Sequence, residues 1–157
     1  YKSGANGKYK PVKAMVCSTG YATPVGTFPL GEKMRWHTLM GPCYGQYCTR
    51  IHGGILFHSV WYYKQTPSSL SASAYNKLGV TASHGCVRLS VADAKWIYDN
   101  VPSGSPVTVY NSSNPGPLGK PSAIKLPYSS TWEQSDLSSA LSSSCWYSSQ
   151  HCPPPSA

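Results

Sequence analysis

The segment at residues 83–90 has the sequence Ser-His-Gly-Cys-Val-Arg-Leu-Ser and combines the side chains that cysteine-dependent acyl transfer requires. Cys86 can act as a nucleophile when its thiol loses a proton, and the glycine before it lets the backbone turn tightly. Arg88 can bind a substrate carboxylate through two N–H groups. The segment therefore indicates a site for covalent catalysis by a thiolate.

A cysteine nucleophile needs a base, because a free thiol is mostly protonated at neutral pH. The sequence offers His84 beside the thiol and His58 upstream, in an apolar strand-like segment that could lie alongside Cys86. We predict His58 as the base, oriented by a backbone carbonyl near Ser59, because carboxylates are scarce in this sequence. Gly85 would leave nearby backbone N–H groups free to stabilise an oxyanion.

Two other interpretations stay open on these residues alone. A turn histidine beside a structural cysteine would give the same pattern without any chemistry. A zinc site is the second alternative, since His58, His84 and Cys86 are of the ligand types that zinc prefers. The sequence has no Cys-x-x-Cys pair, so we predict no metal.

The chain has six cysteines, and a nucleophile among them must stay reduced. Two local disulfides would leave two thiols free and would indicate an oxidising compartment. The competing arrangement pairs all six cysteines and leaves no nucleophile. We predict the first arrangement, with disulfides Cys43–Cys48 and Cys145–Cys152, a buried thiol at Cys17 and a reactive thiol at Cys86.

The composition is typical of one extracellular domain. The 157 residues are 40% hydrophobic and only 11% charged, which favours strands and turns over long helices. The net charge of +8 comes from few acidic residues, and the basic residues form no run, so nucleic acid is not expected as a partner. No stretch is as apolar as a membrane span. We expect the first strand, and any export signal or anchor, to lie upstream of Tyr1.

Turn signals and hydrophobic periodicity predict a mostly β domain over residues 1–111 and a Pro/Ser-rich extension over residues 112–157. Ser90 is a good N-cap with Asp93 three residues later, so the clearest helix is expected to begin there. The other expected elements are a hairpin within residues 1–31, strands within 11–18, 23–30, 33–41, 47–60 and 106–110, a loop at 43–48, and one or two helical turns at 70–78.

Four blocks of the sequence resemble, in the right order, the L,D-transpeptidase catalytic domain of the YkuD-type family. Residues 83–89 look like the active-site signature of that family. Residues 18–28 resemble its early strand and turn, residues 55–59 its histidine strand, and residues 90–110 its closing helix and strand. The resemblance implies a mostly β fold, an L,D-transpeptidase-type β-sandwich or open barrel with one or two short helices.

The resemblance also implies a role for each residue of the site. Cys86 would be the nucleophile and His58 the base, with the carbonyl of Ser59 orienting the imidazole. The implied catalytic residues are Cys86, His58, Ser59, His84 and Gly85, and the implied substrate-binding residues are Arg88 and Ser83.

Members of this family form an acyl-enzyme at the third residue of a peptidoglycan tetrapeptide stem and expel the terminal D-Ala. The acyl group then passes to an amine of another stem, which gives a 3→3 cross-link. We therefore expect peptidoglycan stem peptides as partners, carbapenems as inhibitors, no cofactor, and a monomer outside the cytoplasm. The alternatives are an L,D-carboxypeptidase and a non-catalytic wall-binding module in which Cys86 is oxidised.

Two features depart from the family pattern. The separation of His58 and Cys86 is longer than is common, which indicates an insertion at residues 61–79, a candidate lid over the groove. His52 also precedes a glycine and fits the family's His-Gly pattern, but it lies farther from the thiol. We therefore predict His58 rather than His52 as the base.

Overall fold

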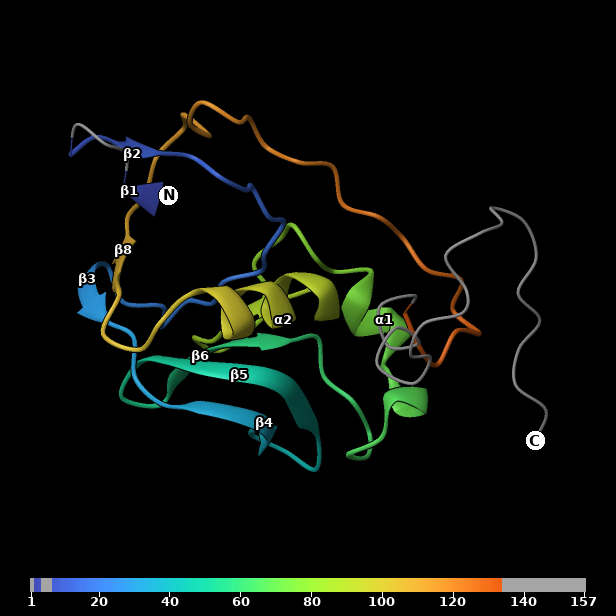
Figure 1. Ribbon diagram of the computed structural model, residues 1–157. Coiled ribbons are helices and arrows are strands. Elements are labelled where there is room, and N and C mark those ends of the chain that lie inside the picture. The colour runs from blue at the N-terminus through green and yellow to red at the C-terminus, as the bar shows by residue number, and fades with distance from the viewer. Residues whose placement is uncertain (1, 4–6, 134–157) are drawn as a thin grey trace, which may run out of the picture.

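The computed structural model describes residues 2–3 and 7–133. A four-stranded sheet forms the centre of the fold, and the longer of its two α-helices lies across one face of that sheet (Figure 1). Two short two-stranded sheets complete the strand content of the described residues. The architecture is mostly β with short helices, which confirms the predicted fold class.

The central sheet has the strand order β4-β5-β6-β7. Its first three strands pair antiparallel through two hairpin turns, whereas β7 pairs parallel with β6 after a long connection. The strands are β4 (Lys33–Thr38), β5 (Tyr44–His52), β6 (Ile55–Ser59) and β7 (Val87–Leu89).

The predicted loop at residues 43–48 is wrong, because almost all of it lies in the first half of β5. The two hairpin turns fall on either side of that strand. The first is closed by a 2.9 Å hydrogen bond from the backbone N–H of Leu39 to the carbonyl of Cys43. The second is made by Gly53 and Gly54, where Gly53 takes a φ of 52° that glycine adopts without strain. The single strand predicted over residues 47–60 is therefore two strands.

The helix predicted after Ser90 is confirmed as α2 (Val91–Asn100). The hydroxyl of Ser90 accepts a 3.1 Å hydrogen bond from the backbone N–H of Asp93, which satisfies one of the free donors of the first turn. Its apolar face packs onto the sheet and holds β7 in place. The buried residues of this core include Tyr47, Val60, Tyr62, Leu89, Val91, Ala94 and Ile97.

The N-terminal hairpin is present as β1 (Lys2–Ser3) paired with β2 (Tyr9–Lys10), and β3 (Gly26–Pro29) pairs antiparallel with β8 (Pro106–Val109). The strand predicted at residues 11–18 is wrong. Within that segment only its last residue, a serine, forms a β-bridge, because no described strand lies beside the rest.

The connection between β6 and β7 carries η1 (Pro67–Ser69) and α1 (Ala72–Tyr75). The helical turns predicted at residues 70–78 are confirmed, although α1 ends at Tyr75 with Asn76 as its C-cap, and Gly79, with a φ of 96°, lies three residues farther on. Leu70 and Leu78 are buried in the same core as α2. This connection is therefore anchored to the domain at α1, while its first part runs along the surface.

Part of the predicted C-terminal extension is attached to the domain. The side chain of Asn76 bonds to the backbone N–H and carbonyl of Leu126, each at 2.8 Å. The backbone N–H of Leu70 donates to the carbonyl of Thr131 at 2.7 Å. The carboxylate of buried Glu133 accepts a 3.2 Å hydrogen bond from the first turn of α2, where the helix dipole favours negative charge. The domain division at residue 111 stays a prediction.

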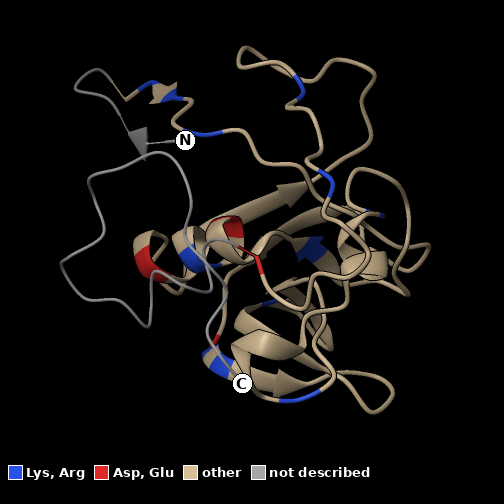
Figure 2. Ribbon diagram, turned by 90° about the vertical axis from the view of Figure 1, so that its right-hand side faces the viewer, with Lys and Arg blue, Asp and Glu red and all other residues tan. Residues whose placement is uncertain are grey.

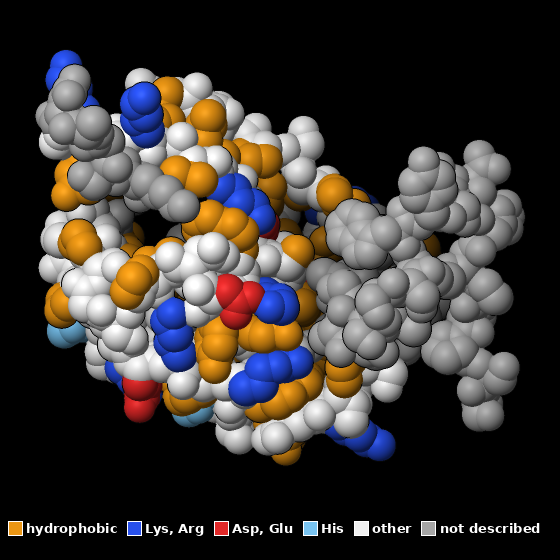
Figure 3. All heavy atoms as spheres, in the orientation of Figure 1, with side chains coloured by type: hydrophobic (Ala, Val, Ile, Leu, Met, Phe, Trp, Pro, Cys, Tyr) orange, Lys and Arg blue, Asp and Glu red, His pale blue; other side chains and the backbone are white. Residues whose placement is uncertain are grey.

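Lys and Arg residues are distributed along the chain rather than gathered on one element (Figure 2). On the face shown in Figure 3 they lie among polar and apolar side chains, and an acidic side chain adjoins some of them. Lys13 pairs with Asp93 at 2.7 Å, and Lys95 pairs with Asp99 within α2. No helix in the described ranges has the length and apolar character needed to cross a membrane.

Candidate active site

The parallel pairing of β6 with β7 brings together two segments that are far apart in the sequence. In this register His58 lies opposite Arg88, and Phe57 lies opposite Val87, which directly follows Cys86. Neighbouring strands are about 4.8 Å apart. The fold therefore places the predicted base, nucleophile and cation on adjacent backbone segments.

The imidazole of His58 is 2% exposed, and its Nδ1 lies 2.5 Å from the carbonyl oxygen of Ser59. A carbonyl oxygen can only accept a hydrogen bond, so Nδ1 carries the proton and Nε2 is left as the acceptor. This is the tautomer that a general base requires. The contact with Ser59 is the one that the family resemblance implied.

Burial lowers the pKa of His58 to about 4, because the surrounding protein cannot solvate an imidazolium. The hydrogen bond to the Ser59 carbonyl opposes this shift, whereas the charges of Arg88 and His37 add to it. At neutral pH His58 is therefore a neutral imidazole that can accept a proton.

The turn before β7 is fixed by side-chain hydrogen bonds to its backbone. The hydroxyl of Ser83 donates to the carbonyl of Cys86 at 2.6 Å, and the hydroxyl of Thr23 donates to the carbonyl of Gly85 at 2.7 Å. The Cys86 thiol itself is half-buried and lies 3.6 Å from the carbonyl oxygen of Gly54. Ser83, which we predicted as a substrate-binding residue, thus uses its hydroxyl to shape the turn that presents the thiol.

Gly85 is required here by close packing. A Cβ at Gly85 would lie 2.6 Å from the side chain of Ile55 and 3.3 Å from the backbone of Ala22. Gly20 packs against the same turn from the other side, because a Cβ there would lie 2.3 Å from the carbonyl oxygen of Ser83. These two glycines let the segment at residues 18–23 lie directly on the thiol-bearing turn.

The guanidinium of Arg88 belongs to the same site. Its Nη1 donates to the carbonyl of Ala82 at 2.8 Å, and its Nε is buried without a hydrogen-bond partner among the described residues. Burial lowers the pKa of Arg88, while the nearby thiols Cys43 and Cys86 favour its charged form.

A cavity of about 870 Å³ opens onto these groups. The imidazole of His84 is exposed at its edge and meets the ring of Tyr21 edge to face at 5.9 Å. Tyr21, Met40 and Tyr63 are all exposed at the rim, so the entrance is largely apolar. The cavity is lined by six of the predicted site residues, namely Cys86, His58, His84, Gly85, Arg88 and Ser83. Among the described residues, no three His, Cys, Asp or Glu side chains are grouped to hold a metal ion.

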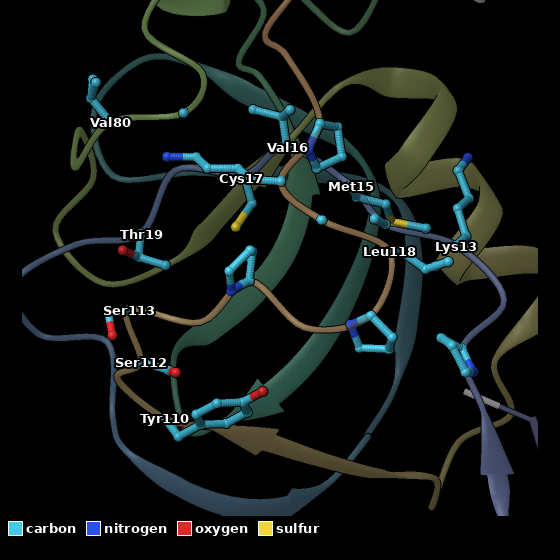
Figure 4. A pocket seen from close by; sticks show the side chains of 18 of the residues that line it. Lys13, Met15, Val16, Cys17, Thr19, Val80, Tyr110, Ser112, Ser113 and Leu118 are labelled. Atoms are coloured by element: carbon cyan, nitrogen blue, oxygen red, sulfur yellow. The ribbon is translucent and has the colours of Figure 1, made fainter.

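A second cavity, of about 660 Å³, lies between residues 11–19 and 110–121 (Figure 4). Its lining includes Lys13, Cys17 and Thr19, with no histidine and no acidic residue. Cys17, predicted as a buried thiol, is exposed and points into this cavity. Because the second cavity lacks a histidine or a carboxylate that could act as a base for that thiol, the first cavity is the candidate active site.

The predicted disulfide Cys43–Cys48 is wrong, since both residues are free thiols. Cys43 directly precedes β5 and Cys48 lies within it, and an extended chain rises about 3.3 Å per residue, so their α-carbons are roughly 16 Å apart. A disulfide needs α-carbons within about 7 Å. Cys86 is also free, whereas the predicted pair Cys145–Cys152 lies outside the described residues.

The profile of the L,D-transpeptidase catalytic domain (YkuD) matches residues 5–109 of this sequence. The chain belongs to this family. YciB of Bacillus subtilis (strain 168), a protein provisionally named an L,D-transpeptidase, is 37% identical over 118 residues, which are 69% of this chain and 58% of YciB. The protein is therefore a member of an enzyme family with a cell-wall-related function. It spans less than two thirds of the length of YciB.

Solved L,D-transpeptidases share the fold. The enzyme from Mycobacterium smegmatis is 24% identical with a TM-score of 0.51, over 64% of this chain and 49% of that one. LdtMt1, solved in complex with imipenem, is 24% identical with a TM-score of 0.51, over 63% of this chain and 49% of that one. This L,D-transpeptidase domain thus spans about half the length of these structures.

The other histidine considered as a base is separate from the site. His52 is exposed and stacks on Phe28 with ring centroids 4.7 Å apart, away from the cavity that holds Cys86. The hairpin turn between His52 and His58 breaks the strand periodicity that would have put both on one face. The structure therefore groups His58, and not His52, with the thiol.

Sequence reasoning missed three residues of the L,D-transpeptidase site. His37 of β4 and Cys43 line the cavity, and Gly45 of β5 packs directly against His58. The isolated histidine and the isolated glycine gave no motif. Cys43 was predicted to form a disulfide with Cys48, and that prediction excluded it as a free thiol of the site.

The pKa of His58 predicts an acid-sensitive fold. This pKa is about 4 in the folded protein against 6.5 in an unfolded chain, so the unfolded chain binds more protons between these values. We expect the stabilising contribution of neutral His58 to be fully present above pH 6.5. The free energy of unfolding should then fall by about 3 kcal/mol as the pH drops toward 4. Urea unfolding at a series of pH values measures this slope, and the His58→Gln variant should lack it. If the free energy of unfolding depended on pH in the same way in the native protein and in His58→Gln, the lowered pKa of His58 would be contradicted.

Proposed function

We propose that this protein is an L,D-transpeptidase that forms 3→3 cross-links through an acyl-enzyme on Cys86. The observation that carries the proposal is the state of His58. Its Nδ1 is bound to the Ser59 carbonyl, so a neutral Nε2 is available as a proton acceptor in the cavity that holds Cys86. A thiol with such a base beside it is equipped for nucleophilic attack.

In the first half-reaction, Nε2 of His58 takes the proton of the Cys86 thiol and the sulfur attacks the carbonyl carbon of the third stem residue. Backbone N–H groups at Gly85 and Cys86 stabilise the oxyanion. The C–N bond to D-Ala then breaks, and the imidazolium gives its proton to the leaving amine. The products are free D-Ala and a thioester on Cys86.

In the second half-reaction, an amine of another stem attacks the thioester. His58 removes the proton that this amine must lose, and the Cys86 thiolate leaves and regains a proton from the imidazolium. Arg88 is the cation of this site, and it lines the same cavity as Cys86. A substrate carboxylate is a further partner for the part of its guanidinium that faces the cavity.

The surroundings of the site agree with a stem peptide as substrate. The apolar rim at Tyr21, Met40 and Tyr63 can cover the peptide, while Arg88 inside can bind one of its carboxylates. Because peptidoglycan lies in the cell wall, we place the protein outside the cytoplasm, as a monomer. Carbapenems are proposed inhibitors, since the related LdtMt1 was solved with imipenem.

Hydrolysis is the second candidate reaction. The cavity of about 870 Å³ has an exposed rim, so water can reach a thioester on Cys86. The protein would then be an L,D-carboxypeptidase with the same acyl-enzyme. The third interpretation, a wall-binding module with an oxidised Cys86, loses its basis because this thiol is free.

Incubation with purified disaccharide-tetrapeptides tests the proposal. Transpeptidation predicts a cross-linked dimer that lacks one D-Ala, whereas hydrolysis predicts tripeptides and free D-Ala, and mass spectrometry separates the two. A protein that leaves tetrapeptides intact, although its Cys86 is reduced, would overturn both enzymatic assignments.

A further inference from the structure

His37 lies on the same face of the central sheet as the proposed base His58, and Gly45 lies between the two histidines. His37 of β4 is the register partner of Gly45 of β5, so both residues point to the same face of the sheet. The backbone of Gly45 touches His58, since a Cβ there would lie 3.1 Å from both Cβ and Nδ1 of the imidazole side chain. No side chain of β5 therefore stands between His37 and His58 at this position.

His37 also opens onto the proposed reaction site. It lines the cavity of about 870 Å³ together with His58 and Cys86, and it is half-buried. Its charge is one of the causes that lower the pKa of His58. Two independent observations, the register across Gly45 and the shared cavity, thus place a second titratable imidazole where it can act on the base.

Other charged and titratable groups surround the base. Arg88 of β7 acts on His58 in the same direction as His37. The charges of α2, which packs against the core, are already paired as Lys13–Asp93 and Lys95–Asp99. The remaining titratable side chains of the cavity are Tyr21, Cys43, Tyr63, His84 and Cys86. Among the described residues that line this cavity, none is a carboxylate that could offset a positive charge on His37.

We infer that His37 is a positioning residue for acyl transfer, whose charge acts on the His58 imidazole across the bare backbone of Gly45. The inference rests on the proposed function, because it assigns His37 a part in the proton transfers of that reaction. Positive charge on His37 disfavours the imidazolium form of His58. The imidazolium gives up its proton more readily as a result, which assists protonation of the leaving amine.

The test replaces His37 and follows His58 directly by NMR of ring-labelled histidines. His37→Gln removes the charge and should raise the titration midpoint of His58 by about half a unit to one unit. The acid limb of the pH profile of kcat/KM should move upward by the same amount, with KM unchanged. His37→Lys keeps a positive charge and should leave the midpoint at or below that of the native protein.

His52→Gln is the matched control, because it removes an exposed imidazole outside the cavity and should shift neither the midpoint nor the profile. An unchanged His58 midpoint in His37→Gln would overturn the inference, whether or not the enzyme turns over. A shifted midpoint in a protein that never processes tetrapeptides would support the coupling of the two imidazoles and refute the proposed function instead. The two failures are therefore distinguishable.

Discussion

Replacing Cys86 with alanine is expected to abolish both the release of D-Ala and the formation of cross-linked dimers, by at least about a thousandfold. The sulfur is the atom that forms the proposed acyl-enzyme, and Cys43, the other described thiol of this cavity, lies just before β5 and not on the turn that precedes β7. The turn that carries Cys86 is held by the hydroxyls of Ser83 and Thr23, which the substitution leaves in place. The thiol is half-buried, so the free energy of unfolding should change by less than about 1 kcal/mol.

Cys17→Ala is the matched control, because it removes an exposed thiol from the second cavity. This variant should retain full turnover and a carbapenem adduct of unchanged mass. The adduct should be missing from Cys86→Ala. An adduct that persists in Cys86→Ala would place the reactive thiol elsewhere, and residual turnover near the native rate would refute the acyl-enzyme.

The sequence was most informative where the signals were local. The cap at Ser90 and the helical spacing after it depend on residues close in the chain, and the structure confirms both. The grouping of His58 with Cys86 could also be anticipated, because the resemblance to the family covers both the histidine strand at residues 55–59 and the segment at residues 83–89. Motif and capping signals therefore predicted the frame of the site well.

The errors arose where long-range pairing decides the outcome. Cys43 and Cys48 suggested a closed loop, yet the segment between them pairs with β4 and forms the first half of β5, a central strand of the sheet. The segment at residues 11–18 has strand composition but no strand beside it among the described residues. Which segments find a partner is a property of the assembled sheet, and residue types alone do not encode it.

The glycines of the site show the same limit. Glycine in a sequence suggests a turn, whereas Gly20 and Gly85 are needed because two backbone segments touch. Neither contact can be read from spacing, since each joins residues that are distant in the chain. The same reasoning identifies Gly45, which no sequence pattern singled out, as a residue on which catalysis depends.

Gly45→Ala is expected to lower kcat/KM by about a hundredfold. The added methyl group would lie 3.1 Å from Cβ and Nδ1 of His58, closer than carbon and nitrogen atoms pack without strain. Gly45 and His58 are both buried, so the imidazole has little room to yield, and its hydrogen bond to the Ser59 carbonyl should be lost or distorted. Without that bond the tautomer with a free Nε2 is no longer favoured, and the base is misplaced relative to Cys86.

Steady-state kinetics with tetrapeptide stems measure the loss, and urea unfolding should show a destabilisation of about 1–3 kcal/mol from overpacking. Gly31→Ala serves as the control, because its methyl group would meet only the side chain of Arg50, whose Cβ lies at 3.3 Å, and Gly31 does not line the cavity that holds Cys86. That variant should stay within about twofold of native turnover. If Gly45→Ala kept native kcat/KM while the imidazole of His58 still titrated as in the native protein, the contact across β5 would not position the base. His37 would then act on His58 through its charge alone, and the packing of Gly45 would not fix the position of the His58 imidazole.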